Sequence, residues 1–174
     1  LLEDVPGIGK TTMANSTTPS IKALSDYGPI LVFFAAYMLS DLFVATAALY
    51  TPEAYGIGAV GGIHTASLVE LSVGTAIGAI TFSGSLVAFA KLQGLVSGAP
   101  LSFPGQHALN AVLGLTVIAL GVWLAMSESY TAYWGLVGLT FILGLLIIVP
   151  IGGADMPVVI SMLNSYSGWA ACGI

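Results

Sequence analysis

Positive charge is the scarcest property of this chain, whose 174 residues include three lysines and no arginine. Binding to nucleic acid requires a basic footprint, so we expect no nucleic-acid partner. Charged residues of both signs make up only 6% of the sequence, against roughly 25% in soluble domains. A single cysteine, Cys172, excludes an internal disulfide and a cysteine-rich metal site. The two histidines show no HExxH spacing, so we expect no metal site.

Apolar residues are abundant instead, at 57% of the chain, together with 22 glycines. Several apolar runs are long enough to cross a hydrocarbon core about 30 Å thick. We therefore predict an all-α, polytopic transmembrane bundle with about five spans. The expected spans are 29–50, 67–89, 108–126, 133–151 and 157–174. The sequence is still apolar at Ile174, so we expect the last span to be truncated there.

Residues 1–26 are mixed and polar, which predicts a poorly ordered leader ahead of a membrane domain at 27–174. The stretch VPGIGKTT at 5–12 is close to a Walker A loop, but Asp4 stands where the first glycine of that motif belongs. A phosphate-binding loop functions between a parallel strand and a helix in a sheet. Apolar runs of this kind build no such sheet, so we exclude nucleotide hydrolysis.

The charges also predict an orientation in the membrane. With five spans, Lys10, Lys22 and Lys91 fall on one side, and the turns with Glu53 and Glu128 fall on the other. The positive-inside rule places the lysine side in the cytoplasm, or in the matrix of a mitochondrion. Asp155 then faces the same compartment as the lysines.

The second span carries one stripe of small and polar residues. Glu70, Gly74, Gly78, Thr81 and Ser85 fall within about 80° of one another on a helix. Such polar groups must face protein or water, because lipid offers them no partner. The G-x-x-x-G pair is typical of tight helix packing. Alternatively, the two hydroxyls bond back to their own helix, and the glutamate lies at the membrane interface.

The fifth span has a second stripe, with Ser161, Asn164, Ser165 and Gly168 within about 100°. The amide of Asn164 can both donate and accept hydrogen bonds, so it can hold a chain of water molecules. Its alternative role is a contact between helices, worth about 1 kcal/mol.

Two acidic residues are further candidates. Asp155 stands before the fifth span as a cap of that helix or as a gate at the membrane mouth, and the two roles are compatible. Asp41, near the middle of the first span, is a candidate proton-binding group or an interhelical contact.

Three strings resemble the beta-subunit membrane domain of proton-translocating NAD(P) transhydrogenase. They are IGAITFSGSLVAFAKLQG at 77–94, PGQHALN at 104–110 and IGGADMPVVISMLNSYSGW at 151–169, and the resemblance extends over about 51–174. It implies a helical bundle that conducts protons and couples their flow to hydride transfer from NADH to NADP+. Asn164 matches the family's channel asparagine, and Asp155 matches the loop aspartate that faces the NADP(H)-binding domain. The family's channel histidine has no counterpart between Leu1 and Gly62.

The resemblance also implies partners. Hydride transfer belongs to separate soluble domains that bind NAD(H) and NADP(H), so this chain would bind no cofactor and would not be catalytic alone. The implied partners are the lipid bilayer, the alpha subunit and the NADP(H)-binding domain, in a homodimeric complex of a bacterial or mitochondrial inner membrane. The other lining residues of the proton path would be Ser161, Ser165, Glu70, Thr81 and Ser85, and the helix-packing glycines would be Gly74, Gly78 and Gly168.

Two further resemblances lie near the N-terminus. Residues 19–48 resemble septation protein A-like membrane proteins, and 1–14 resemble the P-loop of MoxR-type AAA+ ATPases. The first of these supports an alternative function for the chain, a non-enzymatic structural or scaffold protein of the inner membrane.

Overall fold

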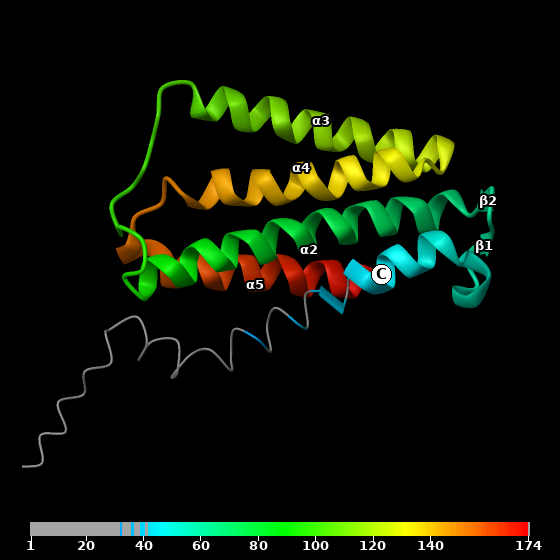
Figure 1. The fold of residues 1–174 in the computed structure, drawn as a ribbon, viewed down its shortest axis with the longest axis horizontal. Coiled ribbons are helices and arrows are strands. Elements are labelled where there is room, and N and C mark those ends of the chain that lie inside the picture. The colour runs from blue at the N-terminus through cyan, green and yellow to red at the C-terminus, as the bar shows by residue number, and fades with distance from the viewer. Residues whose placement is uncertain (1–31, 33–35, 37–38, 41, 174) are drawn as a thin grey trace, which may run out of the picture.

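A computed structural model describes residues 32, 36, 39–40 and 42–173 of the chain (Figure 1). The leader expected at 1–26 and the candidate Asp41 lie outside the described residues. The first helix is described as a continuous segment at 42–50, and residues 32, 36, 39 and 40 are also helical.

The rest of the described chain is almost entirely helical, which confirms the all-α prediction. The elements are the 3-10 helix η1 (Pro52–Tyr55), strands β1 (Gly58–Ala59) and β2 (Gly62–Ile63), helices α2 (Thr65–Leu92), α3 (Gln106–Ser127) and α4 (Tyr130–Ile148), the 3-10 helix η2 (Gly153–Asp155) and α5 (Met156–Gly173). Three of them, α2, α3 and α4, are long and apolar enough to cross a membrane. The 18-residue α5 is not among these three.

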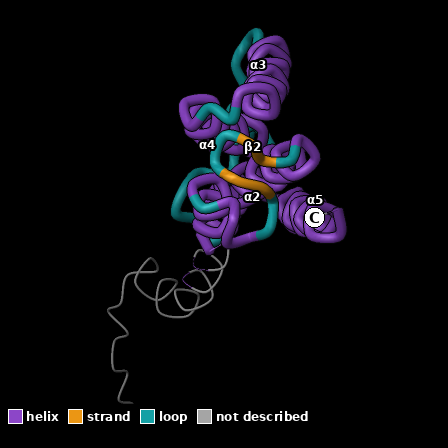
Figure 2. Tube along the Cα trace, turned by 90° about the vertical axis from the view of Figure 1, so that its right-hand side faces the viewer, coloured by secondary structure: helices purple, strands orange, loops and turns teal. Residues whose placement is uncertain are grey.

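Helix α2 is the centre of the bundle, because it packs against α3, α4 and α5. Helices α3 and α5 lie at opposite edges, with α2 and α4 between them (Figure 1, Figure 2). The chain reverses at two ends. We call the end with residues 51–64 and 128–129 the hairpin end, and the end with residues 91–105 and 149–156 the loop end.

Glycine allows α2 and α4 to approach closely, but not at the positions expected from the sequence. A Cβ added to Gly144 of α4 would lie 2.6 Å from the Ile80 carbonyl oxygen of α2. In contrast, a Cβ added to Gly78 or Gly168 would meet nothing within 4 Å. The G-x-x-x-G spacing identifies a helix face without bulky side chains, but it does not identify which helix packs against that face. Within the described residues, close contacts between α2 and α4 lie at Gly144 and at Gly84, where an added Cβ would come within 2.9 Å of Ile148 Cγ1.

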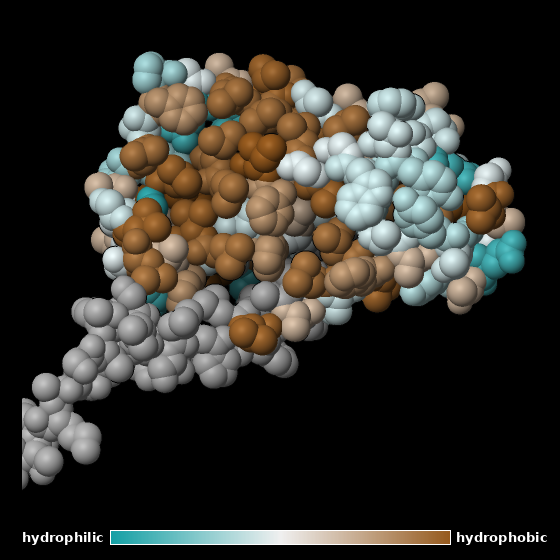
Figure 3. Space-filling model, viewed as in Figure 1, coloured by the Kyte–Doolittle hydropathy of each residue, from teal (hydrophilic) through white to brown (hydrophobic). Residues whose placement is uncertain are grey.

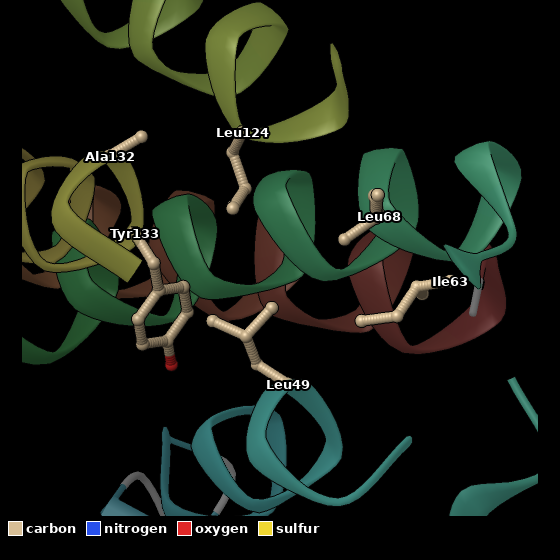
Figure 4. Packing of buried hydrophobic residues seen from close by; sticks show 6 residues of the cluster. All are labelled: Leu49, Ile63, Leu68, Leu124, Ala132 and Tyr133. Atoms are coloured by element: carbon tan, nitrogen blue, oxygen red, sulfur yellow. The ribbon is translucent and has the colours of Figure 1, made fainter. Parts of the chain in front are cut away.

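The buried apolar residues form two clusters, one toward each end. The hairpin-end cluster contains Leu49, Ile63, Leu68, Leu124, Ala132 and Tyr133 (Figure 4). In Figure 4 the Tyr133 ring of α4 points toward the first helix, where its hydroxyl lies 2.9 Å from Thr46 Oγ1. Because Thr46 donates its proton to the Leu42 carbonyl at 2.7 Å, Tyr133 is the donor in the bond between the two hydroxyls. The loop-end cluster contains Ala88, Ile148, Met156 and Leu163.

Residues 56–65, between the first two expected spans, contain a small antiparallel hairpin. Gly58 pairs with Ile63, and Ala59 pairs with Gly62. The hairpin is tied to the turn between α3 and α4, because the Ile63 amide donates to Glu128 Oε1 at 2.9 Å. Glu128 itself has a φ of 50° at the end of α3, a left-handed conformation that is uncommon for a residue other than glycine.

The outer surface is strongly apolar, as a membrane protein requires. Figure 3 shows apolar residues over much of the face in view. Helix α3 is the most exposed of the three candidate spans, and its outward residues include Val112, Leu115, Ile118 and Val122. Contiguous apolar surface of this kind is covered by lipid or by other helices.

Candidate functional site

The residues predicted to line a proton path lie in two places, which the described chain does not join. On α2, Thr81 is 2% exposed, Ser85 is half-buried and Glu70 is exposed. On α5, Ser161, Asn164 and Ser165 are all exposed. The two stripes therefore have different environments in this bundle.

A cavity of about 540 Å³ lies between the first helix, α2 and α4. One wall is formed by the predicted stripe of α2, through Glu70, Gly74 and Gly78. Because these glycines carry no side chain, the backbone of α2 is accessible from the cavity. The opposite walls are largely apolar and include Leu42 and Phe141. The polar groups of the cavity are thus concentrated along α2.

Thr75 is a cavity residue that sequence reasoning missed. Its side chain is 6% exposed. Its Oγ1 atom makes no well-formed hydrogen bond within the described part of the chain, and the Tyr133 hydroxyl is a polar neighbour of this atom. A buried hydroxyl without a partner is costly, typically about 1–3 kcal/mol. Thr75 escaped notice because it lies about 140° from Glu70 around the helix, outside the stripe. Only the position of α2 at the centre of the bundle shows that both of its faces contact protein.

Water can complete the hydrogen bonding of Thr75 in this cavity. The volume exceeds what one water molecule needs, and buried waters occur where polar atoms line the space. The exposed carboxylate of Glu70 and the hydroxyl of Ser67 lie on the same lining. Together with Thr75 Oγ1 they supply a short polar route along α2 from the cavity toward the hairpin end.

Several other polar side chains are occupied by their own helix. Thr81 Oγ1 bonds to the Ile77 carbonyl at 2.8 Å and lies 3.0 Å from the Gly78 carbonyl. Ser165 Oγ donates to the Ser161 carbonyl at 3.0 Å. This is the back-bonding that sequence reasoning left open as the alternative for Thr81. A hydroxyl bonded in this way can still accept a hydrogen bond through its second lone pair.

Asn164 points away from the centre of the bundle. Its neighbour Leu163 is 7% exposed and lies in the loop-end cluster with Ala88 of α2. A step of one residue turns a helix by about 100°, so the side that buries Leu163 turns Asn164 outward. Figure 2 shows α5 at the edge of the bundle. An amide cannot be satisfied by lipid, and this face of α5 therefore requires protein or water beyond the described chain.

Asp155 ends η2 and immediately precedes α5 at the loop end. Its side chain is exposed, while its backbone amide donates to the Gly152 carbonyl at 3.1 Å. The next residue, Met156, is fully buried in the loop-end cluster. The backbone on both sides of Asp155 is therefore fixed, and its carboxylate is presented at the surface.

Comparison with known proteins identifies the family of this chain. A family model for the NAD(P) transhydrogenase beta subunit matches residues 29–174. This chain belongs to the NAD(P) transhydrogenase beta subunit family. The match begins before residue 51, where the resemblance noted in the sequence begins, and it takes in most of the segment at 19–48. With three helices able to span a bilayer, the chain is a membrane protein of the transhydrogenase family.

Curated relatives support the same assignment. The NAD(P) transhydrogenase subunit beta of Rhodospirillum rubrum is 61% identical over 145 residues, which is 83% of this chain and 31% of that protein. The same subunit from a named strain of that species matches equally well. The chain thus spans about a third of the length of the curated relatives it matches.

Proposed function

We propose that this chain is part of the proton-conducting membrane domain of an NAD(P) transhydrogenase. In that enzyme, proton movement would be coupled to hydride transfer between NADH and NADP+ on separate soluble domains. The observation that carries the proposal is the family match over 29–174, together with 61% identity over 145 residues to a beta subunit. It is supported by three helices able to cross a membrane and by polar groups placed at membrane depth.

The proposed path uses both polar surfaces of the bundle. On α5, the exposed Asn164 would hold water between its amide and the neighbouring Ser161 and Ser165, once another helix covers this face. On α2, the cavity wall with Glu70 would provide hydrated space toward the hairpin end, and Thr81 and Ser85 lie further along the same helix toward the loop end. Each surface supplies hydrogen-bonding groups that lipid cannot satisfy.

Asp155 would connect the path with the nucleotide chemistry. Its carboxylate is exposed at the loop end, just before the helix that carries Asn164. A carboxylate at this position can contact a soluble domain and can exchange protons with water at the mouth of the path. We propose that it faces the NADP(H)-binding domain.

The partners follow from the same proposal. NAD(H) and NADP(H) would be bound by the soluble domains, including the alpha subunit, and the complex would be a homodimer in a bacterial or mitochondrial inner membrane. Gly78 and Gly168 have no neighbour within 4 Å of an added Cβ, so both remain available for packing against helices beyond the described chain, and Gly74 would take part on the face that lines the cavity.

The experiment compares Asn164→Leu with wild type in the complete transhydrogenase assembled around this chain and reconstituted in vesicles. An enclosed pH-sensitive dye reports proton transport driven by NADH and NADP+, and nucleotide absorbance reports hydride transfer. We expect transport in Asn164→Leu to fall to the level of protein-free vesicles, because leucine cannot hold water.

Met162→Leu is the matched control, since Met162 is an exposed apolar residue two positions earlier on the same helix. It should transport protons like the wild type. Equal transport in Asn164→Leu and Met162→Leu would remove Asn164 from the path. Absence of nucleotide-driven transport in the wild type would instead contradict the proposed function, and would favour the structural, septation-type alternative.

A further inference from the structure

The end of α4 leaves a backbone carbonyl without its usual partner. In a helix, the Leu146 carbonyl would accept from the amide four residues later, but that residue is Pro150, which has no N–H. The side chain of Gln106, at the start of α3, supplies the missing donor: its Nε2 atom lies 3.0 Å from the Leu146 oxygen. Gln106 is only 5% exposed, so its amide is committed to this contact.

The carbonyls of Val149 and Ile151 also lack the amide four residues later, for a different reason. The Gly153 amide, four residues after Val149, donates to Gly98 at 2.8 Å instead. The Asp155 amide, four residues after Ile151, bonds within η2. Lys91 Nζ donates to both carbonyls, at 2.8 Å for that of Ile151, and the Val149 oxygen also accepts from the Leu101 amide at 3.4 Å.

The environment of Lys91 is unusual for a lysine. The side chain is 6% exposed at the end of α2, whereas lysine is almost never fully buried unless it is paired. Within the described residues it pairs with carbonyl oxygens and with no carboxylate. The carbonyl end of a helix carries partial negative charge, which favours a cation there. One side chain thus joins the end of α2 to the end of α4.

These contacts determine the position of the segment that carries Asp155. The loop is held on one side by Lys91 at Ile151 and by the backbone contact of Gly153, where an added Cβ would come within 3.3 Å of Gly98 Cα. On the other side Met156 is fully buried. Asp155 lies between these two anchors.

We propose that Lys91 is a positioning residue that holds the Asp155 loop to the end of α2. This role in coupling rests on the proposed function, because it assumes that Asp155 communicates with a nucleotide-binding domain. Since α2 also carries the polar wall of the cavity, a rigid link through Lys91 connects a shift of the Asp155 loop to the helix that lines the cavity. Without the link the loop and α2 can move independently.

The experiment replaces Lys91 in the complete transhydrogenase held in lipid nanodiscs. Lys91→Met keeps the length and the apolar stem of the side chain but removes both hydrogen bonds. Hydrogen–deuterium exchange of the peptide covering 149–155 then reports how often the loop opens. We expect exchange at the Gly153 and Asp155 amides to become about tenfold faster or more, as the loss of charge-assisted bonds implies.

Two further variants separate positioning from general damage. Lys91→Arg keeps a charged donor and should restore most of the protection. Leu92→Met alters an exposed neighbour on the same helix end and should exchange like the wild type. If Lys91→Met fails to assemble, Lys91→Leu, which also removes every donor, is measured in the same way. Unchanged exchange in whichever of these two variants assembles would overturn the proposal.

The ratio of protons transported to hydrides transferred is the second measurement. A loose loop should lower the number of protons transported per hydride transferred, while hydride transfer and the thermal unfolding midpoint stay close to wild type. A ratio equal to that of wild type, despite faster exchange, would overturn the positioning role. A parallel fall in transport, hydride transfer and stability would show a merely structural role. The exchange measurement does not depend on proton transport, so it also distinguishes failure of this inference from failure of the proposed function.

Discussion

At the scale of single residues, most hydroxyl groups in this bundle are satisfied by their own helix. Ser72, Ser83 and Thr140 are buried, and each donates to the carbonyl four residues earlier, at 2.6, 2.9 and 2.7 Å. In a membrane such bonds are the simplest way to bury a hydroxyl. A serine or threonine in a span is therefore weak support for a proton path. Thr75 is more informative, because its buried oxygen makes no well-formed hydrogen bond in the described part of the chain.

Gly144 lets the backbones of α2 and α4 approach closely. We expect Gly144→Ala to lower the free energy of unfolding by about 1–3 kcal/mol, the usual cost of overpacking. The new methyl group would clash with Ser83 Oγ and with the backbone of Ile80, which cannot rotate away. Thermal unfolding in detergent micelles measures the change.

Gly138→Ala on the same helix is the control. An added Cβ there meets nothing within 4 Å, and alanine is the better helix former by about 1 kcal/mol. This variant should be as stable as wild type or slightly more so. Equal destabilisation of the two variants would mean that α2 and α4 do not pack at Gly144.

At the scale of elements, the helix ends need partners as much as the helix faces do. The start of α4 is capped by Ser129, whose Oγ atom accepts from the Ala132 amide at 3.4 Å. The other end of α4 is capped by side chains that come from α2 and α3. Proline at 150 makes this necessary, because it ends the helix and removes a donor. At the loop end, the residues that cap the end of α4 are therefore the same residues that hold α2 and α3 against it.

The contact between Gln106 and Leu146 can be tested by a double-mutant cycle. Gln106→Leu should cost about 1–3 kcal/mol, since it leaves a buried carbonyl unpaired. In a Pro150→Ala background the new backbone N–H at position 150 can reach the Leu146 oxygen, so the same substitution should cost clearly less. Unfolding free energies of the four proteins give the coupling. An identical cost in both backgrounds would refute this account of the cap.

At the scale of the whole molecule, the predicted orientation in the membrane depends on three lysines. Lys91 is buried against carbonyl groups, and it therefore also has a structural reason to be where it is. Lys10 and Lys22 lie outside the described residues. That Asp155 faces the cytoplasm or the matrix stays a prediction.

The bundle also predicts an asymmetry along α3. Leu124 is fully buried in the hairpin-end cluster, while Leu115 is 67% exposed. Leu124→Ala should cost about 2 kcal/mol or more, mainly through lost packing contacts. Leu115→Ala should stay within about 0.5 kcal/mol. Unfolding in micelles compares them, and a large cost for Leu115→Ala would show that α3 is covered by more protein than the described chain contains.

Sequence alone identified the all-α class, and three of its five expected spans correspond to the helices able to cross a membrane. These follow from the length and hydropathy of single segments, which are local properties. The stripe of Glu70, Gly74 and Gly78 was also predictable, because helical periodicity puts these residues on one face, and they do line one cavity. The resemblance in the strings at 77–94 and 151–169 pointed to the family that the comparison confirms.

Tertiary structure alone decided which neighbour each face meets. It turned Asn164 outward, because α5 packs on α2 through Leu163, and it brought Thr75 to the cavity. It also showed that Lys91, which the sequence places as a charge at the end of a span, links the ends of α2 and α4 through hydrogen bonds. Periodicity relates residues within one helix, whereas burial and hydrogen bonding at these three positions depend on segments far away in the sequence.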